Sequence, residues 1–548
     1  MENKDLNPVE HIKLRSNGLR GTLKESLKDN YTGNVRPDDE ALVKFHGMYV
    51  QDDRDRREER ALKKLDKLYS FMIRLRIPGG VISADQWLTT HRISEQFGTG
   101  TIKITTRQTI QLHGLLKHQL RDTIQGFVQA DLDSIAACGD VNRNVIASSH
   151  PQVSPLHEEI FVYADKLSKH LLPKTKAYYE IFVDDELVYE RETEKDDLYE
   201  DRYLPRKFKI AIAIPPTNDV DVFANDIGLI AIIEEGKFVG FNLAAGGGLS
   251  TTHGNPNTYS RLATELGFVS GEENILKVCY EVLTIQRDFG YRGDRKLARL
   301  KYTIDKMGVE NFKQELEKRS GVKLEPLRHY SFSERNDRYG WQQDYYGKWY
   351  FGVFIENGVI NPRQKAFLYD VANLHVSDVR FTCNQNLILG NIDETDKEKV
   401  QKLIDQHKIG KKDSALRISS MACVALPTCP LALAEAQRYL PELITKIEPL
   451  LKKHKLEKDE ISIRMTGCPN GCGRSYLAEI GFVGTGPGQY NLMLGGDRLG
   501  VRLNRVYKKQ VEESEVLETL DGLFGRYNQE KLKGETFGDY SNRVLLLG

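Results

Sequence analysis

The sequence predicts an α+β protein of three domains with an internally duplicated unit. The chain has 548 residues, more than one domain usually contains. Two distant segments, Lys103–Gly114 (KITTRQTIQLHG) and Arg380–Asn391 (RFTCNQNLILGN), are similar at a constant offset. The aligned identities are Thr105 with Thr382, Gln108 with Gln385 and Leu112 with Leu389. Such a repeat predicts two related halves that pack around a pseudo-twofold axis.

Changes in composition along the chain predict the domain boundaries. Residues 1–70 are a polar N-terminal arm, either a partly disordered tail or a docking arm for a partner. Residues 71–135 and 337–410 are the duplicated halves, for which we expect ferredoxin-like folds. Residues 136–336 predict a mixed α/β domain, with strands at 178–185 (YYEIFVDD) and 207–216 (KFKIAIAIPP). Residues 411–548 predict a second α/β domain.

Polar side chains gather on one face of the segment at 101–114 (TIKITTRQTIQLHG). Strand alternation puts six of them on the same side. These six residues are Lys103, Thr105, Arg107, Thr109, Gln111 and His113. The face is either solvated or the lining of a polar cofactor site, and its length favours the lining. The strand at 71–82 similarly puts Arg74 and Arg76 on one face.

Two lysines mark a candidate anion site in the segment LPRKFK. Lys207 and Lys209 enter a predicted strand and share a face by period two. Like charges on one strand face repel each other, which is costly unless an anion lies between them. We therefore expect a local anion site here.

The overall charge excludes several classes of partner. Lys and Arg together equal Asp and Glu, at 78 each, so no global field recruits nucleic acid or an anionic membrane. No apolar run has the length of a membrane span.

The glycine-rich runs lack the nucleotide-binding order of strand, G-x-G-x-x-G and helix, so any electrons must come from another protein. With few cysteines and no signal peptide, we expect a cytoplasmic protein.

Four of the seven cysteines lie close together in the sequence, in MACVALPTCP and TGCPNGCGR. They are Cys423, Cys429, Cys468 and Cys472. Disulfides are disfavoured in a large chain of a reducing compartment. A zinc site is disfavoured because zinc knuckles usually present C-x2-C pairs. The remaining interpretation is an iron–sulfur cluster held by four thiolates.

These cysteine motifs resemble the signature of the assimilatory sulfite and nitrite reductases, which contain siroheme and a 4Fe-4S cluster. The motifs QDDRD, R-x-R-x-P-G-G, T-x-R-Q-T, N-R-N-V and L-P-R-K-F-K extend the resemblance from about Lys44 to Tyr540. The chain is most similar to the hemoproteins of NADPH-dependent sulfite reductases. The resemblance implies a three-domain siroheme reductase, with cofactors between duplicated halves and mixed α/β domains.

The resemblance also assigns roles to individual residues. The four cysteines would hold the cluster, with Cys472 shared between a cluster iron and the siroheme iron. Siroheme carboxylates would be held by Lys103, Arg107, Arg206 and Arg299. The open face of the siroheme iron would be ringed by Arg74, Arg143, Lys207 and Lys209. In these roles the arginines would position sulfite and the lysines would relay protons.

The implied activity is six-electron reduction of sulfite to sulfide, in sulfate assimilation and cysteine biosynthesis. The electron donor would be a separate NADPH-dependent flavoprotein with FAD and FMN, in a hetero-oligomer, or alternatively ferredoxin. A ferredoxin-dependent nitrite reductase, which makes ammonia, is the enzymatic alternative. A zinc-stabilised interaction protein is the non-enzymatic one. Some relatives carry a Tyr-Cys crosslink, for which Tyr49 and Cys138 are candidates, but an ordinary buried thiol is the favoured interpretation of Cys138.

Overall fold

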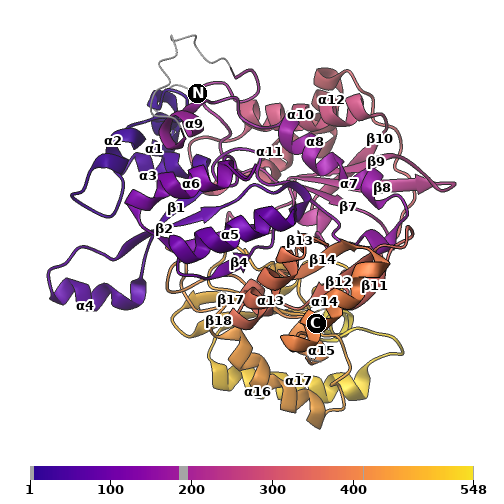
Figure 1. Cartoon of the computed structure of the whole chain (residues 1–548). Coiled ribbons are helices and arrows are strands. Elements are labelled where there is room, and N and C mark those ends of the chain that lie inside the picture. Colours follow the sequence, from indigo (N-terminus) through magenta and orange to yellow (C-terminus); the bar gives the residue numbers. More distant parts are fainter. Residues whose placement is uncertain (1–4, 184–195, 411–412, 547–548) are drawn as a thin grey trace.

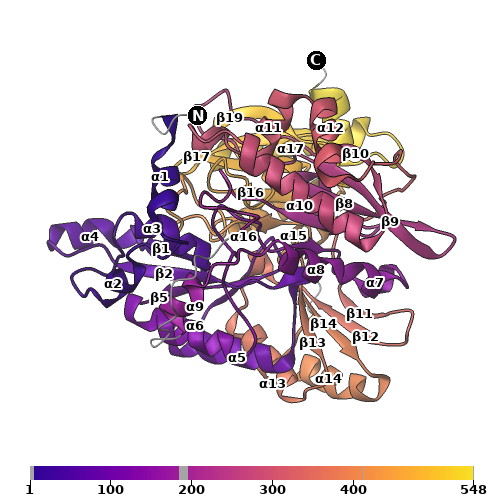
Figure 2. The ribbon, with the colours of Figure 1, turned by 90° about the horizontal axis from the view of Figure 1, so that it is seen from above.

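The computed structural model describes residues 5–183, 196–410 and 413–546. Four sheets of four or five strands are covered by helices (Figures 1 and 2), so the predicted α+β class is correct. One hydrophobic core extends from Leu19 to Ile404 across three sheets, and a separate core extends from Leu416 to Tyr540 around the fourth. Within the described ranges, no helix is long and apolar enough to cross a membrane.

Two of the sheets are antiparallel and belong to the duplicated halves. The first has the order β1 (Met48–Asp52), β2 (Tyr69–Arg74), β5 (Ile110–Leu115), β4 (Ile102–Ile104), with helices α5 (Ala84–Gln96) and α6 (Leu120–Val128). The second has the order β11 (Gly340–Gln343), β12 (Trp349–Val353), β14 (Leu387–Ile392), β13 (Asp378–Phe381), β3 (Val81–Ile82), with helices α13 (Pro362–Asn373) and α14 (Glu394–Gln406). Both copies therefore contain the hairpin that the sequence repeat marks.

The two halves exchange strand segments. β3 belongs to the first half in sequence but pairs with β13 of the second half, with Val379 opposite Ile82. In return, Ile360 of the second half donates its N–H to the carbonyl of Ile102 in β4, at 3.2 Å. Each half completes the other's sheet, which explains why the two halves share one core.

The repeated turn has the same conformation in both halves. The N–H of Thr105 donates to the Thr109 carbonyl at 2.8 Å, and the N–H of Thr382 donates to the Asn386 carbonyl at 3.0 Å. The equivalent glutamines, Gln108 and Gln385, have φ angles of 50° and 68°. The expected continuous strand over 101–114 is therefore wrong, because the chain reverses within it. Thr and Gln are not typical turn residues, so the alternation concealed the turn.

Glycines allow this close packing between the halves. A Cβ atom on Gly80, whose φ is +80°, would lie 2.7 Å from the Gln108 Cβ and 2.8 Å from the Phe381 carbonyl oxygen. Its counterpart Gly358 would meet the Ile104 carbonyl at 2.4 Å. Each glycine thus contacts the repeated turn of its own half and a strand end of the other half.

We expect Gly80→Ala to destabilise the protein by about 3 kcal/mol, since overpacking adds to the cost of a left-handed residue. The matched control is Gly236→Ala, where φ is +73° but no atom lies within 4 Å of the added Cβ. The control should cost only about 1 kcal/mol, from the backbone alone. The measurement is the urea midpoint of each variant. Equal losses would mean that the packing between the halves contributes nothing.

The other two sheets are mixed and share one topology. The first has the order β10 (Thr264–Val269), β9 (Lys237–Ala245), β8 (Ile227–Glu234), β7 (Ile210–Ala213), β6 (Ile146–Ala147). The second has the order β15 (Met421–Ala422), β16 (Ile463–Thr466), β17 (Ile480–Gly486), β18 (Gln489–Leu494), β19 (Arg505–Val511). In each, three parallel strands are followed by two antiparallel ones. The helices of the first unit are α7 (His157–Phe161), α8 (Tyr163–His170), α10 (Glu272–Phe289), α11 (Leu300–Met307) and α12 (Val309–Ser320). Those of the second are α15 (Ala415–Ile418), α16 (Leu440–Lys453), α17 (Glu513–Glu530) and α18 (Phe537–Tyr540). α9 (Ala177–Phe182) packs against α6 of the first antiparallel half.

Local geometry indicates that these two α/β units are also related to each other. Asp221 and Arg474 are both left-handed, with φ of 49° and 56°, and each precedes a short 3-10 helix. Seven residues further on, Gly228 and Gly481 each pack against the carbonyl of the first residue of that helix. Arg474 Nη1 and Asp221 Oδ2 are 2.6 Å apart, so equivalent positions contact each other. We did not find this second duplication in the sequence, because few identities remain.

The N-terminal segment is folded rather than the partly disordered tail that was one expectation. It forms α1 (Pro8–Arg15), α2 (Leu23–Lys28) and α3 (Asp39–Leu42). In α1, Glu10 and Lys13 are fully buried, and Lys13 Nζ donates to the Leu204 carbonyl at 2.7 Å. The segment therefore packs on the α/β unit of residues 136–336.

The strand expected at 178–185 is also wrong in the described part. Residues 177–182 form α9, since the buried residues Ala177, Tyr178, Ile181 and Phe182 follow helical spacing. Residues 184 and 185 lie outside the described ranges. Aromatic and β-branched residues favoured a strand, but the burial pattern of the fold decided for a helix.

Candidate active site

A cavity of about 280 Å³ lies where the first antiparallel half meets both α/β units. It is lined by ten of the twelve residues that the sequence assigned to the site. The ten are Arg74, Arg107, Arg143, Lys207, Lys209, Arg299, Cys423, Cys429, Cys468 and Cys472. The structure therefore brings together residues that are up to about 400 positions apart in the chain.

The four cysteines reach this cavity on two adjacent loops. β15 and β16 are neighbouring parallel strands, with Met421 opposite Arg464, and each is followed by one cysteine pair. Carboxyl ends of parallel strands meet at one edge of a sheet, so the two pairs converge there. All four are free thiols.

The chemistry of these thiols fits a metal cluster. Burial, together with the neighbouring Cys472, raises the pKa of Cys423 and raises that of Cys468 to about 12. Thiols in such a site become thiolates only when a cation binds them. The N–H of Gly467 points at the Cys423 sulfur at 3.4 Å, a donor of the kind that iron–sulfur clusters accept. The residues present thus fit a 4Fe-4S cluster.

The cavity lining carries a large excess of positive charge. Seven arginine and lysine side chains line it, and among the described residues no aspartate or glutamate does. The seven are Arg74, Arg107, Arg143, Lys207, Lys209, Arg299 and Arg474. Arg299 and Arg474 are paired with Asp226 and Asp221, which lie outside the lining, and the other five cations favour anionic ligands. This lining fits a carboxylate-rich cofactor such as siroheme together with a small oxyanion.

The two lysines of the LPRKFK segment have strongly lowered pKa values. Burial and the nearby Arg206 lower the pKa of Lys207 to about 7. Burial and the repulsion of Lys207 lower the pKa of Lys209 well below its ordinary value. A lysine with a pKa near neutrality can donate a proton and recover it.

The arginines are held in place by neighbouring polar groups. Arg74 donates to the Gln111 side chain at 2.8 Å and to the Cys138 sulfur at 3.2 Å, while its buried Nε has no partner. Arg143 donates to the Gly139 carbonyl at 2.8 Å. An orphaned Nε on a cavity-lining arginine leaves a donor for an anion. Cys138 is fully buried, and an ordinary buried thiol stays the prediction for it.

The structure differs from the expected cofactor contacts at two positions. Lys103 does not line the cavity: its Nζ donates to the Asn357 carbonyl at 3.0 Å and to the Gln437 side chain. Arg206 is also outside the lining. Arg299 lines the cavity but is paired with Asp226 at 2.7 Å, so its charge is partly compensated. Of the four expected carboxylate-binding residues, Arg107 and Arg299 are the ones with access to the cavity.

Some functional candidates were missed from the sequence. Arg474 lines the cavity directly after the second cysteine pair, in GCGR, and its position in that motif was the available signal. Asn144 and Asn225 line it too, and both bind Arg107. Nothing in the local sequence marks an asparagine that orients an arginine.

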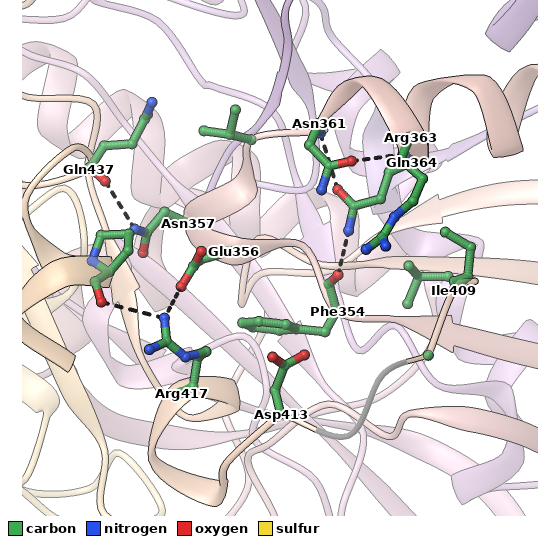
Figure 3. Close-up of a pocket in the computed structure, with 14 residues that line it drawn as sticks. Phe354, Glu356, Asn357, Asn361, Arg363, Gln364, Ile409, Asp413, Arg417 and Gln437 are labelled. Atoms are coloured by element: carbon green, nitrogen blue, oxygen red, sulfur yellow. Dashed lines mark hydrogen bonds and ion pairs between the residues drawn. The ribbon is translucent and has the colours of Figure 1, made fainter. Parts of the chain in front are cut away.

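A second cavity of about 400 Å³ is lined by Asn357 and Gln437, the two residues that Lys103 contacts (Figure 3). Figure 3 shows Arg417 turned toward Glu356, with which it forms an ion pair at 2.5 Å. None of the residues that the sequence assigned to the site lines this cavity. Among its described lining residues there is no cysteine, and two arginines are matched by two acidic residues, so the first cavity is the candidate active site.

Fold and site together define a multidomain iron–sulfur oxidoreductase with an anion-binding cavity. The chain matches the family described as "Nitrite/Sulfite reductase ferredoxin-like half domain" at residues 63–129 and 342–407, and "Nitrite and sulphite reductase 4Fe-4S domain" at 163–324. The four cysteines lie outside these ranges, in the α/β unit that has the same topology as the matched one.

Known proteins are similar over the whole chain. The sulfite reductase (NADPH) hemoprotein beta-component of Leptospira biflexa is 57% identical, covering 98% of each chain. The protein of that name from Bacillus subtilis is 49% identical, covering 98% of this chain and 95% of its own. The solved NirA protein of Mycobacterium tuberculosis has a TM-score of 0.79 at 25% identity, covering 98% of this chain and 96% of that one. This chain belongs to the nitrite and sulfite reductase family, whose cofactors are siroheme and a 4Fe-4S cluster.

Proposed function

We propose that this chain is the hemoprotein component of an assimilatory NADPH-dependent sulfite reductase, which supplies sulfide for cysteine biosynthesis in the cytoplasm. The main support is the cavity, where seven arginine and lysine side chains, and no acidic residue of the described part of the chain, line the site beside four cysteines. The two relatives described above, at 57% and 49% identity, are named as this component. Overall, sulfite takes up six electrons and six protons and gives sulfide and three water molecules.

The residues of this chain would divide the work of binding and protonation. When bound, siroheme and the cluster would supply electrons singly to the substrate at an open iron position. Cys423, Cys429, Cys468 and Cys472 would hold the cluster, and Cys472 would be shared with siroheme. Arg74 and Arg143 would hold the sulfite oxygens by charge-assisted hydrogen bonds. Lys207 and Lys209 would donate protons to the oxygens that leave as water.

Nitrite reduction is the alternative, since it uses the same cofactors and also six electrons. The decisive experiment is anaerobic turnover with reduced methyl viologen, comparing kcat/KM for sulfite and nitrite while sulfide and ammonia are quantified. We expect a clear preference for sulfite with stoichiometric sulfide. A preference for nitrite would assign the chain to the nitrite reductases instead.

We further propose that the flavoprotein donor docks on the connection between β1 and β2, residues 53–67. This arm contains α4 (Arg57–Leu62) and projects from the body in Figures 1 and 2. Its Leu62 and Leu65 are 80% and 51% exposed. At its base, Arg54 Nη1 donates to the Ala432 carbonyl at 2.7 Å, in the loop of the first cysteine pair. A partner on this arm would therefore lie close to the proposed cluster.

Leu62→Asp should lower NADPH-driven sulfide formation, with the flavoprotein present, by about tenfold, since removing a well-packed apolar contact costs about 1.4 kcal/mol or more. Activity with methyl viologen should stay unchanged. Leu532→Asp, at another leucine that is 60% exposed, is the control. Equal losses in both assays would refute the docking role. Deletion of residues 1–60 is a poor test, because it would remove β1 and the buried side chains of α1.

A further inference from the structure

Three buried side chains outside the active-site cavity converge where two domains join. His150 follows β6, Asp219 lies between β7 and β8, and Asp337 precedes β11. Their side chains are almost fully buried, with His150 and Asp337 exposed by only 1% and 2%. One nitrogen and one oxygen from each carboxylate all lie within 4.8 Å of one another. Nothing in the proposed sulfite chemistry uses them.

The contacts of this cluster are not those of a completed hydrogen-bond network. The Asp219 Oδ1 oxygen is buried and has no hydrogen-bond partner. His150 Nε2 and Asp337 Oδ1 are 3.4 Å apart, longer than a good hydrogen bond. This separation is close to the ~3.3 Å between two ligands of a tetrahedral ion with bonds of about 2.0 Å. The unpartnered oxygen and the long contact both leave room for an ion.

The charges of the cluster also call for a cation. Neither Asp219 nor Asp337 forms an ion pair with an arginine or lysine among the described residues. Two ionised carboxylates beside one imidazole would place net negative charge in a buried site. A divalent ion would neutralise the pair completely, which buried charge requires.

Neighbouring residues can orient His150 and Asp337 for metal binding. Gln152 Nε2 lies 3.2 Å from His150 Nδ1, while the Gln152 Oε1 has no partner. Rotating this amide by 180° lets Nδ1–H donate to Oε1 and turns the lone pair of Nε2 toward the carboxylates. Asp337 is oriented by the side chains of Thr382, Asn384 and Asn386 in the repeated turn of the second half. Such outer contacts are typical of metal ligands.

We propose that His150, Asp219 and Asp337 bind a zinc ion that fastens the linker before β11 to the α/β unit of residues 136–336. One imidazole nitrogen and two carboxylate oxygens are suitable zinc ligands, and water takes the fourth position. The alternative is a metal-free cluster in which His150 contacts the carboxylates by hydrogen bonds alone.

The test is metal analysis of the purified holoprotein, with its iron cofactors in place, by mass spectrometry and zinc K-edge absorption. We expect about one zinc per chain, with only nitrogen and oxygen ligands near 2.0–2.1 Å. Less than about 0.1 zinc per chain, even after incubation with zinc sulfate, would overturn the proposal. A zinc–sulfur distance near 2.3 Å would overturn it too, because the metal would then be bound by cysteines.

Two variants locate the ion. His150→Asn and Asp219→Asn should lose the zinc while keeping the full iron content and the siroheme absorption. The control is His407→Asn. His407 lies outside this cluster, and its Nε2 is 2.7 Å from the Asp370 carboxylate. This variant should retain zinc. Zinc retained by both cluster variants would refute the site. If a variant fails to fold, the absorption spectrum of the wild-type protein still decides between an ion with N/O ligands and none.

Discussion

Replacing Cys472 by alanine is expected to abolish sulfide formation. Cys472 lines the cavity with the other three cysteines and is the most exposed of the four. Lys207 and Lys209 are both close enough to be influenced by its charge. If Cys472 holds both the cluster and siroheme, as proposed, alanine cannot replace it, because the binding of both groups would depend on that sulfur.

The measurement combines activity with reduced methyl viologen, iron content and the siroheme spectrum. The control is Cys279→Ala, which removes a buried thiol of α10 whose pKa burial raises to about 12 and which does not line the cavity. This control should keep its activity and its full iron content. If Cys472→Ala kept more than about a tenth of wild-type sulfide formation, the shared-ligand role would be excluded. Loss of an outer contact to a metal ligand lowers activity by about 10–100-fold, and loss of the ligand itself should lower it further.

Sequence reasoning worked best where chemistry and spacing were local. The four cysteines and the pair Lys207 and Lys209 could be found because each motif is short and its residue types have few other uses. The repeat at Lys103–Gly114 and Arg380–Asn391 predicted the duplicated halves for the same reason. Convergence of these motifs on one cavity followed from the family resemblance, since residues hundreds of positions apart carry no signal of contact.

Two kinds of feature could not be predicted. The second duplication is retained in backbone geometry, at Asp221 and Arg474, but hardly in residue identity. Lys103 belongs to the predicted polar face, but its amine is bound by Asn357 and Gln437 instead of lining the cavity. Strand alternation gives the face of a residue but not the tertiary partner, and the partner decides which groups a long side chain reaches.

Lys207→Met is expected to lower kcat for sulfite by about 10²–10⁴-fold, the usual contribution of a general acid. Because burial and Arg206 lower the pKa of Lys207 to about 7, the proton that it donates is present below that pH and lost above it. The wild-type rate should therefore fall as the pH rises through about 7, and the variant should lose this dependence. The measurement is the pH profile of kcat with reduced methyl viologen.

Two further variants separate proton donation from charge. Lys207→Arg keeps the positive charge but not the titration, so it should restore KM for sulfite without restoring kcat. Lys301→Met is the control, since burial also lowers the pKa of Lys301 to about 7, while its amine is bound by the carbonyls of Gly248 and Ser250 and lies outside the cavity lining. If the arginine variant regained full kcat, Lys207 would act only by holding the anion. If the Lys301 variant lost kcat equally at full cofactor content, the effect would not be specific to the cavity. If only the two Lys207 variants lost kcat, a proton donor would be required at this position. The arginine variant retains the charge and the methionine variant retains the packing, so neither of these alone would explain the loss.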